Sequence, residues 1–78
     1  MAVTHELAII DQIRHVLDTV FGIPARRVDR TDDVGADWGL VGQERTALEN
    51  ALYEEFPNCC EPFGDCVTIE DFAQMVAP

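Results

Sequence analysis

The chain has 78 residues, which is enough for one small domain with a single hydrophobic core. Hydrophobic residues make up 47% of it, too large a share for a disordered chain. Fifteen acidic residues stand against five arginines, so the net charge of −10 disfavours nucleic acids and anionic membranes as partners. A buried catalytic cleft of ordinary size has no room in such a domain, so we expect a protein that is not an enzyme.

The sequence contains no apolar run of about eighteen residues, and its first ten residues lack the basic start of a secretory signal. We therefore expect a cytoplasmic, monomeric protein with no membrane segment and with reduced cysteines. The negative charge favours a protein partner that has a basic patch. An acidic surface that serves solubility alone is the alternative.

The first predicted element is a helix over about residues 4–21. Its apolar residues recur at the short intervals that place them on one buried face: Leu7, Ile10, Ile13, Val16, Leu17, Val20 and Phe21. Thr4 is a candidate N-cap for this helix. Gly22 followed by Pro24 predicts its end.

The segment over residues 22–41 predicts a long connection between the first and second helices. It is rich in Asp, Gly and Pro, as turns and loops are. Ile23, Val28 and Val34 are spaced along it as apolar anchors, so we expect the loop to be ordered and fixed to the core.

The second predicted helix covers about residues 42–56, and Pro57 ends it. Its predicted inward positions are Thr46, Leu48, Leu52 and Phe56, or the residues next to them. Residues 58–66 form a turn-rich bridge that has room for a short fourth helix.

The last predicted helix covers about residues 68–77. Thr68 and Asp71 have the spacing of a capping box, with an aspartate in place of the usual glutamate. The predicted buried face of this helix consists of Ile69, Phe72, Ala73 and Val76.

This order of elements, together with three short motifs, resembles the acyl carrier protein family. Phe21-Gly22-Ile23 matches the Leu-Gly-Val that closes the family's first helix, and Asp37-Trp38-Gly39 matches its Asp-Leu-Gly. The run "ALYEEF", residues 51–56, matches the family's Ala-Leu-Glu-Glu-Glu-Phe. The resemblance covers nearly the whole chain and loosens after Cys60. It implies an all-α bundle of three or four helices with a long loop between the first two.

The same register places the family's Asp-Ser-Leu motif on Val41-Gly42-Gln43. Gly42 thus stands where the family's serine carries 4′-phosphopantetheine, and the chain contains no serine at all. Thr46 lies one turn further into the helix, where a β-branched hydroxyl tends to bond back to a preceding carbonyl. A second register lays Gly35-Ala36-Asp37 on a Gly-Ala-Asp of the family and puts Trp38 at the serine position, again without a hydroxyl. We therefore expect no cofactor and no catalytic residue.

The resemblance also implies that the second helix presents acidic side chains to basic partner enzymes. Glu44 and Glu54 fall on positions that are commonly acidic in the family, and Glu49 and Glu55 add to the negative field. The sequence thus predicts a protein-interaction module in acyl metabolism of the fatty-acid or polyketide type. A plain solvated helix face is the alternative for these four acids.

Two other functions stay open. One is a true acyl carrier that is loaded at an atypical residue or holds its load non-covalently. The helix start at Gly42, with Arg45 in the first turn, could hold an anion, although Glu44 in the same turn would repel it.

The other open function is a small metal or redox protein built on Cys59, Cys60 and Cys66. Their C-C-x5-C spacing is not that of a C-x2-C metal knuckle, and the neighbouring acids should raise the pKa of a thiol. We therefore expect no metal site, core positions for Cys60 and Cys66, and an exposed Cys59.

His5 and His15 have no serine or cysteine nucleophile near them in sequence, so surface positions on the first helix are expected. Trp38 is expected to cover the core rather than to hold a ligand.

Overall fold

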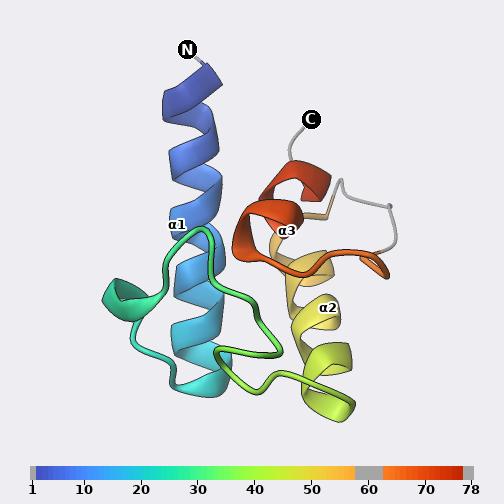
Figure 1. The fold of residues 1–78 in the computed structure, drawn as a ribbon. Helices are drawn as coiled ribbons and strands as arrows, with labels where there is room; N and C mark the ends of the chain where they lie inside the picture. The colour runs from blue at the N-terminus through green and yellow to red at the C-terminus, as the bar shows by residue number, and fades with distance from the viewer. Residues whose placement is uncertain (1, 58–62, 77–78) are drawn as a thin grey trace.

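The computed structural model describes residues 2–57 and 63–76, and the side chains of residues 8–57 and 63–76. Within these ranges the fold is helical and contains no strand, which agrees with the predicted all-α class (Figure 1). The elements are α1 (Ala2–Phe21), the 3-10 helix η1 (Ala25–Arg27), α2 (Gln43–Glu55) and α3 (Ile69–Val76). Among the described residues, no helix combines the length and the apolar character needed to cross a membrane.

Helix α1 is the element on which the other two helices pack. In Figure 1 both α2 and α3 lie on the same side of it, and α2 runs antiparallel to it. Four residues of the predicted apolar stripe are buried, Ile10, Ile13, Val16 and Leu17, and Ile9, which was not predicted on it, is buried too. Val20 is predicted on this face but is 50% exposed. It lies beyond Leu17, which is the last buried residue of the stripe. The helix begins at Ala2, so Thr4 lies inside it and is not its N-cap.

The segment between α1 and α2 is fixed to the core by the side chains of Val28, Val34 and Leu40, each no more than 5% exposed. The anchoring predicted at Val28 and Val34 is thereby confirmed, whereas Ile23 is only partly buried. Such buried aliphatic side chains each contribute about 1.5–3 kcal/mol through removal of apolar surface from water.

The same segment is also hydrogen-bonded to the start of α3. The Val34 N–H donates to the Val67 carbonyl at 3.0 Å, and the Ile69 N–H donates to the Asp32 carbonyl at 3.1 Å. Asp33 and Thr68 form an isolated antiparallel bridge between these two contacts. The loop therefore forms part of the packed structure, and its position is tied to that of α3.

Helix α3 begins with the capping box that the sequence predicts. The Asp71 N–H donates to Thr68 Oγ1 at 3.1 Å, and Asp71 Oδ2 accepts from the N–H of Thr68 at 3.1 Å and of Val67 at 3.0 Å. These backbone donors, Thr68 first, hold the pKa of Asp71 below its ordinary value of 3.8. The side chains of Ile69, Phe72 and Ala73 are buried, as predicted, and join the core.

Candidate functional site: the surface of helix α2

Helix α2 begins at a glycine turn. Gly42 is its N-cap, with φ +61° and ψ −122°, and the Glu44 N–H donates to the Val41 carbonyl at 3.2 Å across the turn. These angles are those of the second residue in a type II′ turn, a place that glycine fills because it has no Cβ. A Cβ added at Gly42 would meet no atom within 4 Å. A serine here would therefore have room for its side chain but would strain the backbone.

Thr46 is the nearest hydroxyl to this turn within α2. Its Oγ1 donates to the Gly42 carbonyl at 3.4 Å, which confirms the predicted bond back to a preceding carbonyl. Thr46 itself is exposed, and its neighbour Arg45 is the partly buried residue at this point of the helix. The buried positions of α2 are Leu48 and Leu52 alone, and Phe56 just beyond the helix is partly buried.

The side chain of Arg45, in the first turn of α2, extends toward the segment before α3. Its Nε donates to Glu49 Oε2 at 3.0 Å, Nη1 donates to the Cys66 carbonyl at 2.8 Å, and Nη2 donates to the Phe63 carbonyl. The guanidinium carbon also lies 4.9 Å from the centre of the Phe72 ring, a cation–π distance. All three nitrogens of Arg45 thus donate to protein acceptors, so this residue is not placed to hold an external anion.

Aromatic rings continue the contact that Arg45 makes with Phe72. The ring of Phe63 lies 5.3 Å from that of Phe72 and 5.0 Å from that of Tyr53, between centroids. These spacings are typical of aromatic pairs that attract one another beyond simple burial. Arg45 and the three rings therefore connect α2 to α3.

The four predicted partner-binding acids do not share one environment. Glu49 is half-buried and paired with Arg45, so its charge is already neutralised within the molecule. Glu44, Glu54 and Glu55 are exposed, and in the described part of the chain their carboxylates make no hydrogen bond or ion pair. The free negative charge of α2 is therefore concentrated at the two ends of the helix.

The two ends of α2 differ in their effect on the helix. Glu44 lies in the first turn, where a negative charge is favoured by the helix dipole. Glu54 and Glu55 lie in the last turn, where the dipole disfavours negative charge, and α2 has no basic residue there. This acidic pair therefore opposes the stability of its own helix.

Of the other predicted site residues that the structure describes, Cys66 lies in the core, and Trp38 and His15 lie outside α2. Cys66 is 6% exposed, which confirms its predicted core position, and burial, followed by the charge of Asp71, raises the pKa of its thiol. Cys59 and Cys60 fall outside the described residues, and so does the side chain of His5. No group of three or more His, Cys, Asp or Glu side chains suited to a metal ion occurs among the described residues.

The aromatic residue before α2 occupies the position that the sequence predicts. Trp38 is partly buried against the core, and its indole Nε1 donates to Asp32 Oδ2 at 3.0 Å. His15 lies exposed on α1, as expected.

Sequence reasoning did not find the connecting role of Arg45. The spacing of Arg45 and Glu49 indicates an i,i+4 ion pair on a helix surface, which is present. The carbonyls of Phe63 and Cys66 lie about twenty positions away in the chain, and no local pattern links them to Arg45.

No protein-family model, curated protein or solved structure matches this chain. The resemblance to acyl carrier proteins therefore rests on the residues and motifs of the sequence itself.

Proposed function

We propose that this protein is a non-catalytic, acyl-carrier-like interaction module. In this proposal α2 docks on a basic patch of an enzyme that acts in acyl metabolism of the fatty-acid or polyketide type. The observation that supports it best is the pair Glu54 and Glu55, which is exposed and unpaired within the described residues at the unfavourable end of α2. A basic partner would supply the positive charge that the last turn of the helix lacks.

The electrostatic effect of such a surface is mainly on the rate of association. Exposed charges steer an oppositely charged partner during diffusion. Each ion pair at the solvent-exposed edge of an interface adds only about 0.2–1 kcal/mol to the binding free energy. Docking through Glu44, Glu54 and Glu55 should therefore be fast and strongly dependent on salt. Glu49 is left out of this surface, because its carboxylate already accepts from Arg45.

The conformation of Gly42 favours a module without a prosthetic arm over a carrier. The residue at the position of the family's attachment serine has no hydroxyl, and its φ of +61° suits a glycine. The only aliphatic hydroxyl within α2, that of Thr46, is engaged with the Gly42 carbonyl. For these reasons the proposal assigns no phosphopantetheine and no other cofactor to this protein.

The docking surface is tested by reversing one charge in the protein's own host. Tagged wild type, Glu54→Arg and Asp11→Arg are captured with their bound proteins, which are identified by quantitative mass spectrometry. Asp11 is the matched control, because its carboxylate is 70% exposed on α1 and its reversal changes the net charge by the same amount. We expect an enzyme of acyl metabolism to be lost with Glu54→Arg and kept with Asp11→Arg.

If that enzyme is retained equally by both variants, docking through the last turn of α2 is wrong. Circular dichroism of each variant establishes that a loss of binding does not come from unfolding.

The absence of a prosthetic arm is tested by the intact mass of the protein purified from its host. The mass of the unmodified chain is expected. An added mass that maps to one residue would overturn this part of the proposal and support a carrier loaded at an atypical position. The same spectrum under native conditions would reveal a metal retained by the cysteines.

A further inference from the structure

The arginines of this protein fall into two groups. Three are engaged within the molecule: Arg14 pairs with Asp11 at 2.9 Å, Arg30 with Glu70 at 2.6 Å and Arg45 with Glu49 at 3.0 Å. Arg26 and Arg27 are exposed on η1, and their side chains form no hydrogen bond or ion pair with any other part of the chain that the structure describes. Two adjacent cations thus have no partner among the described residues, although the protein has fifteen acidic residues.

The backbone that carries this pair is held in place from both sides. Before it, the Ala25 N–H donates to Asp18 Oδ2 on α1 at 3.2 Å. After it, the Val28 side chain is buried, and the Val28 carbonyl accepts from Arg14 Nε at 2.8 Å. The two arginines are therefore presented on a rigid turn, so binding a partner would order only their side chains.

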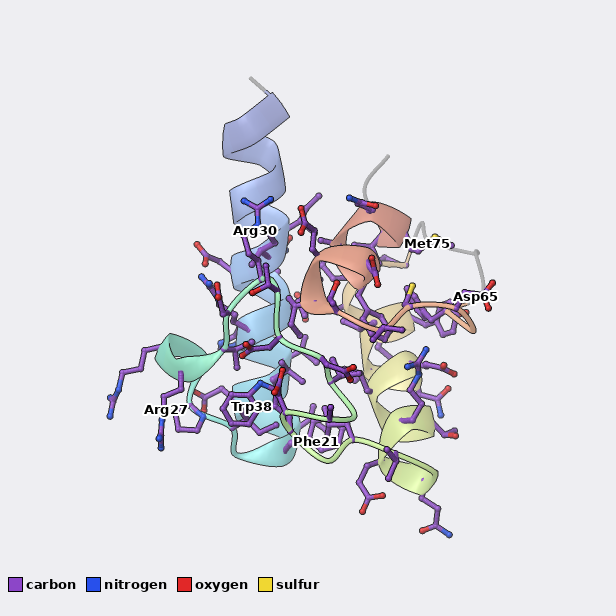
Figure 2. The ribbon with its side chains drawn as sticks, in the orientation of Figure 1. Phe21, Arg27, Arg30, Trp38, Asp65 and Met75 are labelled. Atoms are coloured by element: carbon purple, nitrogen blue, oxygen red, sulfur yellow. The ribbon has the colours of Figure 1, made fainter. Side chains whose placement is uncertain are left out.

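The position of η1 separates this pair from the acidic surface of α2. Figure 1 shows η1 and α2 on opposite sides of α1. In Figure 2 the Arg27 side chain extends outward from η1, away from the three helices. A protein docked on α2 would therefore leave Arg26 and Arg27 accessible.

We propose that Arg26 and Arg27 form a second docking surface, which binds an acidic segment of a protein other than the one bound by α2. A 3-10 helix has three residues per turn, so consecutive side chains leave it about 120° apart. That divergence suits two separate carboxylates along a protein segment better than one point anion such as phosphate. With surfaces of opposite sign on opposite sides, the module can join a basic protein to an acidic one.

The proposal is tested by NMR titration of the isotope-labelled full chain with a capped hexaglutamate peptide. The titration is run in about 0.01 M salt, where screening extends to about 30 Å. We expect saturable shifts in the backbone amides of residues 25–28. The indole N–H of Trp38 should respond too, because Asp32 Oδ2 accepts both from this group at 3.0 Å and from the Asp29 N–H at 2.8 Å.

Three variants separate a specific contact from a general change in charge. Arg27→Gln is expected to weaken peptide binding at least threefold, and the double variant Arg26→Gln/Arg27→Gln at least tenfold. Arg30→Gln removes the same single charge as Arg27→Gln from an arginine that pairs with Glu70, and it should change the affinity by less than about twofold. Arg27→Lys keeps the charge and should keep most of the binding.

Four results would overturn the proposal. The first is that the amides of residues 25–28 do not shift, and the second is that Arg30→Gln loses as much affinity as Arg27→Gln. The third is that inorganic phosphate binds at the same amides as tightly as the peptide or more tightly. The fourth is that the amide shifts grow with protein concentration when no peptide is present. The third would indicate a point-anion site, and the fourth a contact between copies of the chain. Unchanged spectra of the core residues show in each variant that the fold is intact.

Discussion

The two ends of helix α2 differ in whether a charged side chain is paired within the fold. In the first turn, Arg45 is half-buried and each of its nitrogens donates to an acceptor on Glu49, Phe63 or Cys66. In the last turn, Glu54 and Glu55 are exposed, unpaired within the described residues and opposed by the helix dipole. One end uses its charge to hold the fold together, and the other carries charge that the fold does not need.

This difference indicates which charges to examine for function. A satisfied, half-buried cation is explained by stability, because its removal leaves carbonyl and carboxylate groups without a donor. An unpaired acid at the wrong end of a helix works against stability, so a use outside the fold is the better explanation. The comparison makes opposite predictions for the two ends, and they can be tested by mutation.

The largest expected effect is at Arg45. Arg45→Met keeps much of the side-chain volume but removes the donors to the carbonyls of Phe63 and Cys66, so we expect a loss of roughly 2–3 kcal/mol in the free energy of unfolding. Urea unfolding followed by circular dichroism measures it. Arg30→Gln, which breaks an ion pair between more exposed groups, serves as the control and should lose less than about 1 kcal/mol. A loss at Arg45 no larger than the control's would remove Arg45 as the link between α2 and α3.

The next effect is expected at Gly42. Gly42→Ser restores the hydroxyl of the acyl carrier family, but its side chain disfavours the φ of +61°, so we expect a loss of about 1–2 kcal/mol. Gly64→Ser is the matched control, because Gly64 is also open to a Cβ and does not have a positive φ. Thermal unfolding of both variants gives the comparison. Equal stability of the two would show that the turn before α2 adapts to a side chain.

An intermediate effect is expected at Asp71, which caps α3. Asp71→Asn weakens the bonds from the Val67 and Thr68 N–H groups and should lower the free energy of unfolding by about 1 kcal/mol at neutral pH. The pKa of Asp71 is lower in the fold than its ordinary 3.8, so the charged form stabilises the fold above pH 3.8 and this contribution is lost as the pH falls through the folded pKa.

The difference in the free energy of unfolding between wild type and Asp71→Asn should therefore be constant near pH 6 and shrink below about pH 3.8. Urea unfolding at several pH values measures it. Asp65→Asn removes the same charge from an exposed residue nearby that no described backbone donor contacts, and it should show no such gap. A gap for Asp71→Asn that persists undiminished under strongly acidic conditions would mean that its charge does not strengthen the cap.

The smallest effect has the opposite sign. Neutralising the last turn with Glu54→Gln and Glu55→Gln should stabilise the protein by roughly 0.3–0.5 kcal/mol per charge, because the helix dipole no longer opposes them. Glu44→Gln at the other end of the helix should destabilise it by a similar amount. Differential scanning calorimetry at low salt resolves these shifts.

A fall in stability with Glu54→Gln and Glu55→Gln would mean that these acids support the fold. Their role in docking would then lose its best evidence.

The sequence by itself determined the three helices and most of their ends, but not the start of α1, which lies at Ala2 and not at Thr4. The three-and-four spacing of apolar residues places α1, because one face of a helix must be buried whatever lies opposite it. The capping box of Thr68 and Asp71 and the bond from Thr46 to the Gly42 carbonyl also followed from the sequence, since each joins residues three or four positions apart. The spacing of Val28 and Val34 also indicated that the first loop is anchored.

Only the tertiary structure decided which charges are satisfied. The i,i+4 spacing of Arg45 and Glu49 indicates their ion pair, but the bonds from Arg45 to the Phe63 and Cys66 carbonyls are visible only in the fold. The inward position of Arg45 depends on segments far away in the chain, and the exposure of Val20 does not follow from the apolar spacing of α1. The physical reason is that helix periodicity reports local geometry, whereas the environment of a side chain is set by the elements that pack against it.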